Sequence, residues 1–236
     1  MYTDYRSSSE EYMMQGQVSE FMYRVYGWMS AALVVTAGVA YYVAHTPAIQ
    51  AALFKSSGLL IGICIAQFAL VLGLGLFINK MSYPVASIVF MVYSAMLGLT
   101  LSSIFVVYDM PSIGVTFLVT AGMFGAMCLY GYTTKSDLTT IGNIAMMALF
   151  GMVIAMLANL YFQNQTTDYI ISGIGVLVFT ALIAYDAQKI KQMGYQMLSH
   201  GQALDKVSVI GALMLYLDFV NLFLFLLRFL GNRKEN

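Results

Sequence analysis

The segment 211–227, GALMLYLDFVNLFLFLL, decides the class of the fold. Its strongly polar residues are Asp218 and Asn221, and no lysine or arginine lies within it. Apolar and polar residues do not alternate with a period of two, as they would in a strand of a membrane β-barrel. A helix needs about 20 apolar residues to cross the hydrocarbon core of a bilayer. The segment therefore predicts a transmembrane helix, which we place at 207–230.

The rest of the chain has the same character. It is 60% hydrophobic and 9% charged over 236 residues, whereas a soluble domain has about 25% charged residues. The net charge is zero, so we expect no nucleic-acid partner, because that needs a basic face. The bilayer is the expected solvent. Six further segments are long and apolar enough to cross it: 24–44, 57–78, 83–107, 112–132, 138–161 and 169–190.

The predicted fold class is thus all-α, a polytopic membrane protein with seven transmembrane helices. We expect residues 1–20 to form a polar, disordered cytoplasmic tail, because they lack the basic head and apolar middle of a signal peptide. Residues 21–231 are predicted to form the transmembrane domain, and 232–236 a short tail. The one longer loop is expected at about 191–206.

The placement of lysine and arginine predicts the orientation. With the N-terminus in the cytoplasm, one basic residue before the last helix lies outside, Lys55. The cytoplasmic side then holds Arg6, Arg24, Lys80, Lys135, Lys189, Lys191 and Lys206. If all seven helices cross, the basic residues Arg228, Arg233 and Lys234 fall outside, against this trend. We predict a full crossing and a cytoplasmic N-terminus.

Two aspartates lie inside the last two predicted spans. An ionisable side chain at the centre of a span costs about 2.5–3.5 kcal/mol on insertion scales, so such residues indicate a function by default. Asp186 lies in FTALIAYDAQKI (179–190), where Lys189 at i+3 could pair with it and give it a purely structural role. Asp218 lies deeper, and its nearest polar neighbour on the same face is Asn221.

Because the two helices are consecutive, they are expected to pack as antiparallel neighbours. The carboxyl groups of Asp186 and Asp218 meet if the last helix begins in the cytoplasm near Lys206. Two carboxylates in contact repel when both are ionised, so such a pair titrates as one unit. It can hold two helices together through a shared proton, or it can bind a hard cation such as Ca²⁺.

Other sites have less support in the sequence. Cys64 and Cys128 lie in apolar runs, and His45 and His200 lie in predicted loops without ligand partners. An intramembrane aspartyl protease also carries a Tyr-Asp pair in one helix and an aspartate in the next. That class has GxGD around the second aspartate and a Pro-Ala-Leu motif, and this chain has neither. We therefore expect no enzyme and no resident cofactor.

The chain resembles the transmembrane Bax inhibitor motif family, in its bacterial inner-membrane branch. The resemblance covers nearly all of the chain after the first 20 residues. The segments that carry it are VYGWM (25–29), LTLSSIF (99–105), TAGMFGAM (120–127), LYGYTTKSDL (129–138), AYDAQKI (184–190) and 211–228.

The resemblance implies seven helices, with the last one central and wrapped by the other six. It implies that Asp186 and Asp218 form a pH sensor in a Ca²⁺ leak, which the second helix opens by moving. Channel-type members carry a glutamate and a basic residue in that second helix, where this chain offers the neutral Gln67 and Lys80 at the helix end. Lys80, Gln67 and Asn221 are accordingly candidates for gating or for lining a pore. The alternative is a non-transporting regulator that binds another membrane protein, such as a membrane-bound protease.

Overall fold

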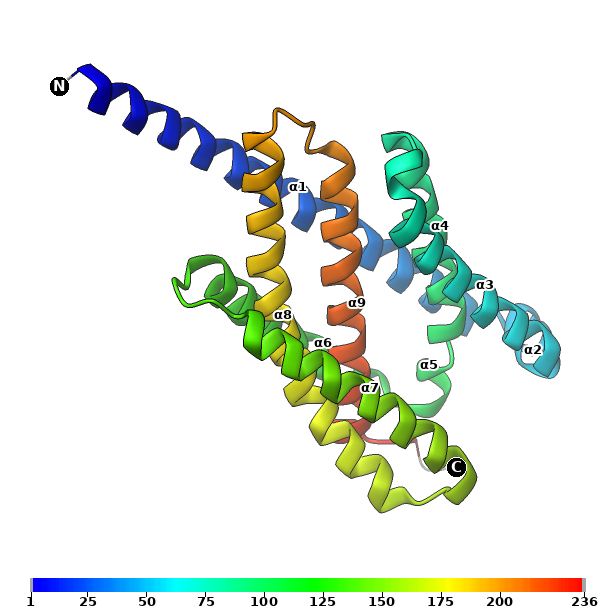
Figure 1. Cartoon of the computed structure of the whole chain (residues 1–236). Helices are drawn as coiled ribbons and strands as arrows, with labels where there is room; N and C mark the ends of the chain where they lie inside the picture. The colour runs from blue at the N-terminus through cyan, green and yellow to red at the C-terminus, as the bar shows by residue number, and fades with distance from the viewer. Residues whose placement is uncertain (1, 235–236) are drawn as a thin grey trace. The chain divides into compact units, whose positions relative to one another are not determined.

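The structure is a computed structural model that describes the backbone of residues 2–234 and the side chains of residues 12–78 and 80–234 (Figure 1). Among these residues, all regular elements are helical. They are α1 (Tyr2–Ala44), α2 (Pro47–Lys55), α3 (Ser57–Phe77), η1 (Ile78–Lys80), α4 (Tyr83–Leu101), α5 (Ile104–Val107), α6 (Met110–Thr133), α7 (Thr139–Phe162), α8 (Gln165–Ser199) and α9 (Asp205–Leu230).

Seven helical segments of the described chain are long and apolar enough to cross a membrane, which confirms the predicted number. They cover 12–44, 57–77, 83–107, 110–133, 139–162, 165–199 and 205–230. Many large apolar side chains on them face outward, for example Leu76 and Leu118, which are 73% and 72% exposed. A water-soluble monomer rarely exposes apolar surface on this scale. The protein is therefore a multi-pass membrane protein in contact with the lipid bilayer.

The helices differ from the predicted boundaries at three places. The stretch 1–20, expected to be disordered, is helical from Tyr2, since it holds no proline and continues an existing helix without a new nucleus. Helix α2 is an additional short helix, and Pro47 occupies its first turn. The predicted loop at 191–206 is wrong, because α8 continues to Ser199 and leaves only a short connection to α9.

The end of α8 has a specific cap. Gly201 adopts φ +64°, the left-handed conformation that costs glycine little. The amide of Gln202 donates to the carbonyl of Met197 (2.9 Å), and the amide of Gly201 donates to that of Leu198 (3.0 Å). This pair of bonds is a Schellman motif, and α8 ends at Ser199, nine residues later than the apolar pattern predicts.

The described chain divides into two compact units. Unit 1 comprises 1–101 and 189–214, and unit 2 comprises 102–188 and 215–236, so α8 and α9 contribute residues to both. The predicted boundaries of a single domain at 21–231 stay a prediction. Residues 235–236 of the predicted short tail lie outside the described residues.

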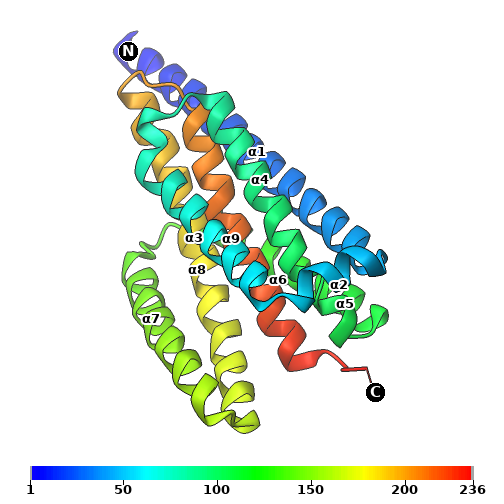
Figure 2. The same ribbon diagram turned by 90° about the vertical axis from the view of Figure 1, so that its right-hand side faces the viewer.

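In unit 1, α1 and α4 pack closely (Figure 2). A Cβ atom at Gly98 would come within 2.7 Å of the carbonyl oxygen of Thr36, so only glycine permits this approach. The Thr36 hydroxyl donates to the carbonyl of Ser94 at 2.9 Å. Small residues and interhelical hydrogen bonds of this kind hold membrane helices together where lipid removes the hydrophobic driving force.

In unit 2, α7 and the first part of α8 form an antiparallel pair, visible in both ribbon views (Figures 1 and 2). Three glycines let neighbouring helices approach: Gly131 faces the backbone of Ala184, Gly142 faces the ring of Tyr185, and Gly175 faces the ring of Phe225. Aromatic edge contacts join the rings of α6 to those of α9, at Phe117, Phe124, Phe219 and Phe223.

Helix α9 is the most buried of the seven spans. In its most apolar window 72% of the residues are buried, against 50% for α8 and 6–28% for the other five spans. Leu215, Tyr216 and Leu222 are fully buried. The last helix is therefore enclosed by protein rather than by lipid, as the resemblance implies.

Candidate functional site

Asp186 lies on a part of α8 that is held on several sides within unit 2. The residue before it, Tyr185, packs against Gly142 of α7, and Ala184 packs against Gly131 of α6. Two residues after it, the Gln188 side chain accepts a hydrogen bond from the amide of Leu138 (2.9 Å) and donates one to the carbonyl of Ser136 (2.8 Å). Asp186 itself is half-buried. Its backbone position is therefore fixed by helix packing and by the α6–α7 turn.

Asp218 lies on α9 and is only 6% exposed. Its neighbour Phe219 contacts Phe124 and Phe117 on α6, with ring centroids 5.3 and 5.5 Å apart. The Oδ2 atom of Asp218 is fully buried, and no donor among the described residues reaches it. An ionised carboxylate in such a place would lack most of the hydrogen bonds that it has in water.

The structure brings Asp186 and Asp218 together. Their carboxyl groups are close enough to interact electrostatically and share a side-chain hydrogen bond. Because an ionised carboxylate only accepts hydrogen bonds, a bond between two carboxyl groups needs a proton on one of them. A carboxyl pair in this arrangement, between two consecutive helices, can share one proton.

The other sequence candidates lie elsewhere. The Asn221 side-chain amide donates a hydrogen bond to the carbonyl of Leu217 one turn earlier (2.8 Å), so this hydrogen bond stays within α9. Gln67 is buried in unit 1 and donates to the carbonyl of Met96 (2.7 Å) and to the hydroxyl of Thr100 (3.3 Å) on α4. Lys80 is exposed at the end of η1, with Nζ 5.9 Å from the centre of the Phe77 ring. Gating or pore-lining roles for Lys80, Gln67 and Asn221 stay predictions.

The described residues contain no group of three or more histidines, cysteines, aspartates or glutamates able to hold a metal ion. Ca²⁺ takes six to eight oxygen ligands. The Asp186–Asp218 pair offers four carboxyl oxygens, so other oxygens would have to complete the shell of any Ca²⁺ ion bound there. Four carboxyl oxygens are better suited to brief contact with a passing ion than to permanent binding of a Ca²⁺ ion.

One structural residue of the site was not identified from the sequence. Gln188 follows Asp186 in AYDAQKI and looks like a polar residue at a helix end, yet it is buried and fixes the α6–α7 turn. No pattern in the sequence marks this role, because the partners of Gln188 lie 50 and 52 residues earlier in the chain.

The fold and the acid pair can now be compared with known proteins. The family model described as "Inhibitor of apoptosis-promoting Bax1" matches residues 18–235 of the chain. The chain belongs to the Bax1 inhibitor family. The match includes both aspartates and nearly all of the seven spans, which confirms the resemblance noted from the sequence segments.

Relatives in the Bax1 inhibitor family come from several bacteria. The chain is 53% identical over 215 residues to inner membrane protein YbhL of Escherichia coli K12, covering 91% of this chain and 92% of that one. It is 41% identical over 218 residues to an uncharacterized protein of Borreliella burgdorferi, covering 92% and 94%. A protein of Deinococcus radiodurans is 40% identical over 219 residues, covering 93% of each. The similarity therefore extends over the full membrane region and is not confined to one motif.

Proposed function

We propose that this chain is a pH-sensitive leak pathway for cations, with Ca²⁺ as the expected ion, in the bacterial inner membrane. The observation that carries the proposal is the hydrogen bond between the carboxyl groups of Asp186 and Asp218, one of them buried. Membership of the Bax1 inhibitor family supports it, and the name of the relative YbhL supports the inner-membrane location.

The pair acts as a latch between α8 and α9. While it holds one proton, the hydrogen bond joins the two helices. When the proton leaves, two negative charges face each other with no described donor at Asp218 Oδ2. At 4 Å and an effective dielectric constant near 20, such charges repel by about 4 kcal/mol. That energy is enough to shift an equilibrium between two helix arrangements about a thousandfold.

The sign of the pH response follows. Protonation favours the joined arrangement that the structure describes, and deprotonation favours separation of α8 from α9. The separated carboxylates then offer hard oxygen ligands to a cation on its way through. We therefore expect cation leak to increase as the pH rises through the range in which the pair loses its proton.

The test is Ca²⁺ flux by the purified full-length chain in liposomes that contain a Ca²⁺ indicator, measured between pH 6 and pH 9. Wild type is expected to leak more at high pH. Asp186→Asn and Asp218→Asn keep a hydrogen-bonding group but cannot build the second charge, so both are expected to leak little at every pH. Asp137→Asn is a matched control, because Asp137 is an exposed carboxylate of the α6–α7 turn. If both pair variants leak with the pH profile of wild type, the latch is wrong.

A second candidate is a non-transporting regulator that binds another membrane protein. The observation that favours it is the exposure of Tyr12 and Met13 at the start of the first span, on α1. This hypothesis expects no flux from the wild-type protein in liposomes. It also expects that removal of residues 1–20 abolishes the cellular phenotype while both Asp→Asn variants preserve it.

A further inference from the structure

An open cavity in unit 2 lies between the end of α7, the start of α8 and the end of α9. Its volume is about 770 Å³, within the range of small-molecule sites. Its polar lining includes Asn159, Asp168, Arg228 and Arg233, and its apolar lining includes Leu157 and Leu160. The α7–α8 turn and the C-terminal end of the chain lie at the same end of unit 2 in both ribbon views (Figures 1 and 2). None of these residues takes part in the aspartate pair.

Hydrogen bonds hold the polar residues Asn159 and Asp168 of the cavity lining in place. The buried Asn159 amide donates to Asp168 Oδ1 (2.7 Å) and to the carbonyl of Asn164 (3.2 Å), and its oxygen accepts from the amide of Asn164 (3.1 Å). Gln163, on the rim, has φ +48°, a conformation that non-glycine residues rarely adopt. Strained positions of this kind cluster at functional sites, and here the surrounding bonds hold the strain in place.

Arg233 is also held in place, although it follows the last helix. The backbone around it pairs with the segment before α6 through a bridge between Tyr108 and Arg233. The amide of Lys234 donates to the carbonyl of Val107 (2.9 Å), and the amide of Asn232 donates to the hydroxyl of Ser112 (3.0 Å). This tie fixes the backbone of an arginine that would otherwise belong to a loose tail, so less freedom is lost when it binds a ligand.

The cavity lies at the ends of three spans, where lipid headgroups are expected. Arg228 occupies the last turn of α9 and Asp168 the first turn of α8. Tyr161 and Phe162 are largely exposed at the same end of α7, as in an interfacial aromatic belt. Below them, Leu157 and Leu160 are 63% and 73% exposed and offer an apolar wall along the side of the cavity.

The charges in the cavity select the ligand. Two guanidinium groups and one carboxylate line it, and no ion pair among the described residues joins Asp168 to Arg228 or Arg233. The cavity thus presents both signs without neutralising them internally. Guanidinium groups suit phosphate through paired hydrogen bonds, and a carboxylate suits an ammonium group that can donate to it.

We propose that this cavity binds the headgroup of a phospholipid that carries a free ammonium group, as in phosphatidylethanolamine. Arg228 and Arg233 take the phosphate, Asp168 takes the ammonium, and the first part of an acyl chain lies along Leu157 and Leu160. A purely anionic headgroup would leave the Asp168 carboxylate facing negative charge. A choline headgroup carries the positive charge but has no N–H with which to donate to Asp168.

The test is native mass spectrometry of the purified full-length protein, titrated in detergent with phosphatidylethanolamine, phosphatidylglycerol or phosphatidylcholine of identical acyl chains. Wild type is expected to bind the ethanolamine lipid most tightly. Arg228→Gln and Arg233→Gln each remove one charged donor, so each is expected to weaken ethanolamine-lipid binding about tenfold. Asp168→Asn keeps an oxygen that can accept from Asn159, so the turn survives, and the preference for ethanolamine over choline is expected to disappear.

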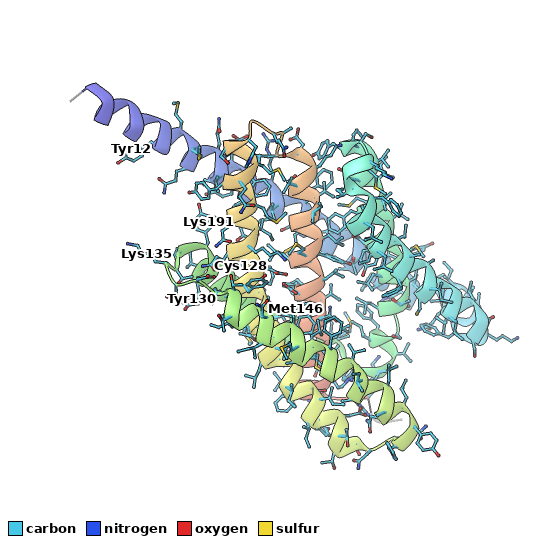
Figure 3. The ribbon with its side chains drawn as sticks, viewed as in Figure 1. Tyr12, Cys128, Tyr130, Lys135, Met146 and Lys191 are labelled. Atoms are coloured by element: carbon cyan, nitrogen blue, oxygen red, sulfur yellow. The ribbon has the colours of Figure 1, made fainter. Side chains whose placement is uncertain are left out.

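Lys135→Gln is the matched control for charge. Lys135 lies at the α6–α7 turn, at the opposite end of α7 from the cavity (Figure 3), and its loss is expected to change no lipid affinity. Thermal unfolding of each variant shows that the fold is intact. Equal affinities of the wild type for the ethanolamine and choline lipids overturn the proposal. So does wild-type affinity in both arginine variants, or release of the lipid by millimolar inorganic phosphate alone, which would indicate a simple anion site.

Discussion

Replacing Asp218 by asparagine should make the stability of the protein independent of pH in the range where wild type loses stability. In wild type, the hydrogen bond to Asp186 requires one proton on the pair. In Asp218→Asn, the amide donates to an ionised Asp186, and no second charge can develop. The two proteins therefore differ most at high pH, where the wild-type pair has lost its proton.

The repulsion between two neighbouring carboxylates sets the size of the effect. Two unit charges 4 Å apart at an effective dielectric constant near 20 repel by about 4 kcal/mol. No donor among the described residues reaches Asp218 Oδ2. For a chain of this length, about 4 kcal/mol corresponds to a difference of about 8–16 °C in Tm.

The number of protons bound in each state decides whether the free energy of unfolding rises or falls with pH. While the pair shares a proton, the native state holds a proton that the separated carboxyl groups of the unfolded chain lose above about pH 4. Above that pH the native state therefore holds one more proton than the unfolded state. Its free energy of unfolding then falls by up to about 1.4 kcal/mol per pH unit, until the pair releases its proton. Wild-type stability should decline from mildly acidic to alkaline pH, and that of Asp218→Asn should not.

The assay is thermal unfolding of the purified protein in detergent at several pH values, with Asp137→Asn as a control that should follow wild type. Parallel Tm profiles for wild type and Asp218→Asn across the whole pH range would refute the reasoning. That result would mean either that the pair carries no shared proton or that an undescribed group neutralises it.

Three other predictions concern the surroundings of the pair. Gly131→Ala should lower stability by about 1–3 kcal/mol, because the added Cβ would meet the backbone of α8. The control Gly122→Ala has open space at its Cβ and should not lower stability. Tm measurements on both variants test this. Gln188→Ala should cost about 1–3 kcal/mol and speed amide hydrogen exchange in the α6–α7 turn, since a buried amide and a carbonyl lose their partner. The bonds from Thr139 to Asp137 lower the pKa of that carboxyl, so the capping of α7 should be present above the ordinary pKa near 3.9 and lost as the pH falls through the lowered value. Slower exchange of the Thr139 amide at pH 5 than at pH 2, after correction for intrinsic rates, would show this.

Much of the architecture could be predicted because lipid imposes a simple rule on the sequence. Each span must bring its own run of apolar residues, and the seven runs are separated by prolines, charges or polar turns. The end of α8 could not be predicted in this way. The segment 191–199 is polar enough to resemble a loop, but local helix propensity continues α8 through it. The cap at Gly201 then ends the helix beyond the apolar stretch.

The candidate site could be predicted in part. Asp186 and Asp218 were identified because charge inside a span is costly, and the antiparallel order of the two helices made their meeting geometrically possible. The amide side chains that hold the neighbouring turns in place could not be predicted in this way. Gln188 bonds to backbone groups 50 and 52 residues earlier in the chain, and no residue pattern marks such partners. Asn159 bonds to the Asn164 backbone and to the Asp168 side chain around the α7–α8 turn. The orientation of the chain stays a prediction, since it depends on the placement of charges relative to a bilayer.

The tie between the end of the chain and the segment before α6 also bears on biogenesis. The Lys234 side chain bonds to the carbonyl of Phe105, 129 residues earlier, and the backbone of Asn232 bonds to Ser112, 120 residues earlier. Because a chain is synthesised from its N-terminus, these bonds form only after residues 232–234 have been made. Until then, the nascent chain holds α5 and the start of α6 without these bonds. Removal of residues 232–234 would leave α5 and the start of α6 permanently without these bonds.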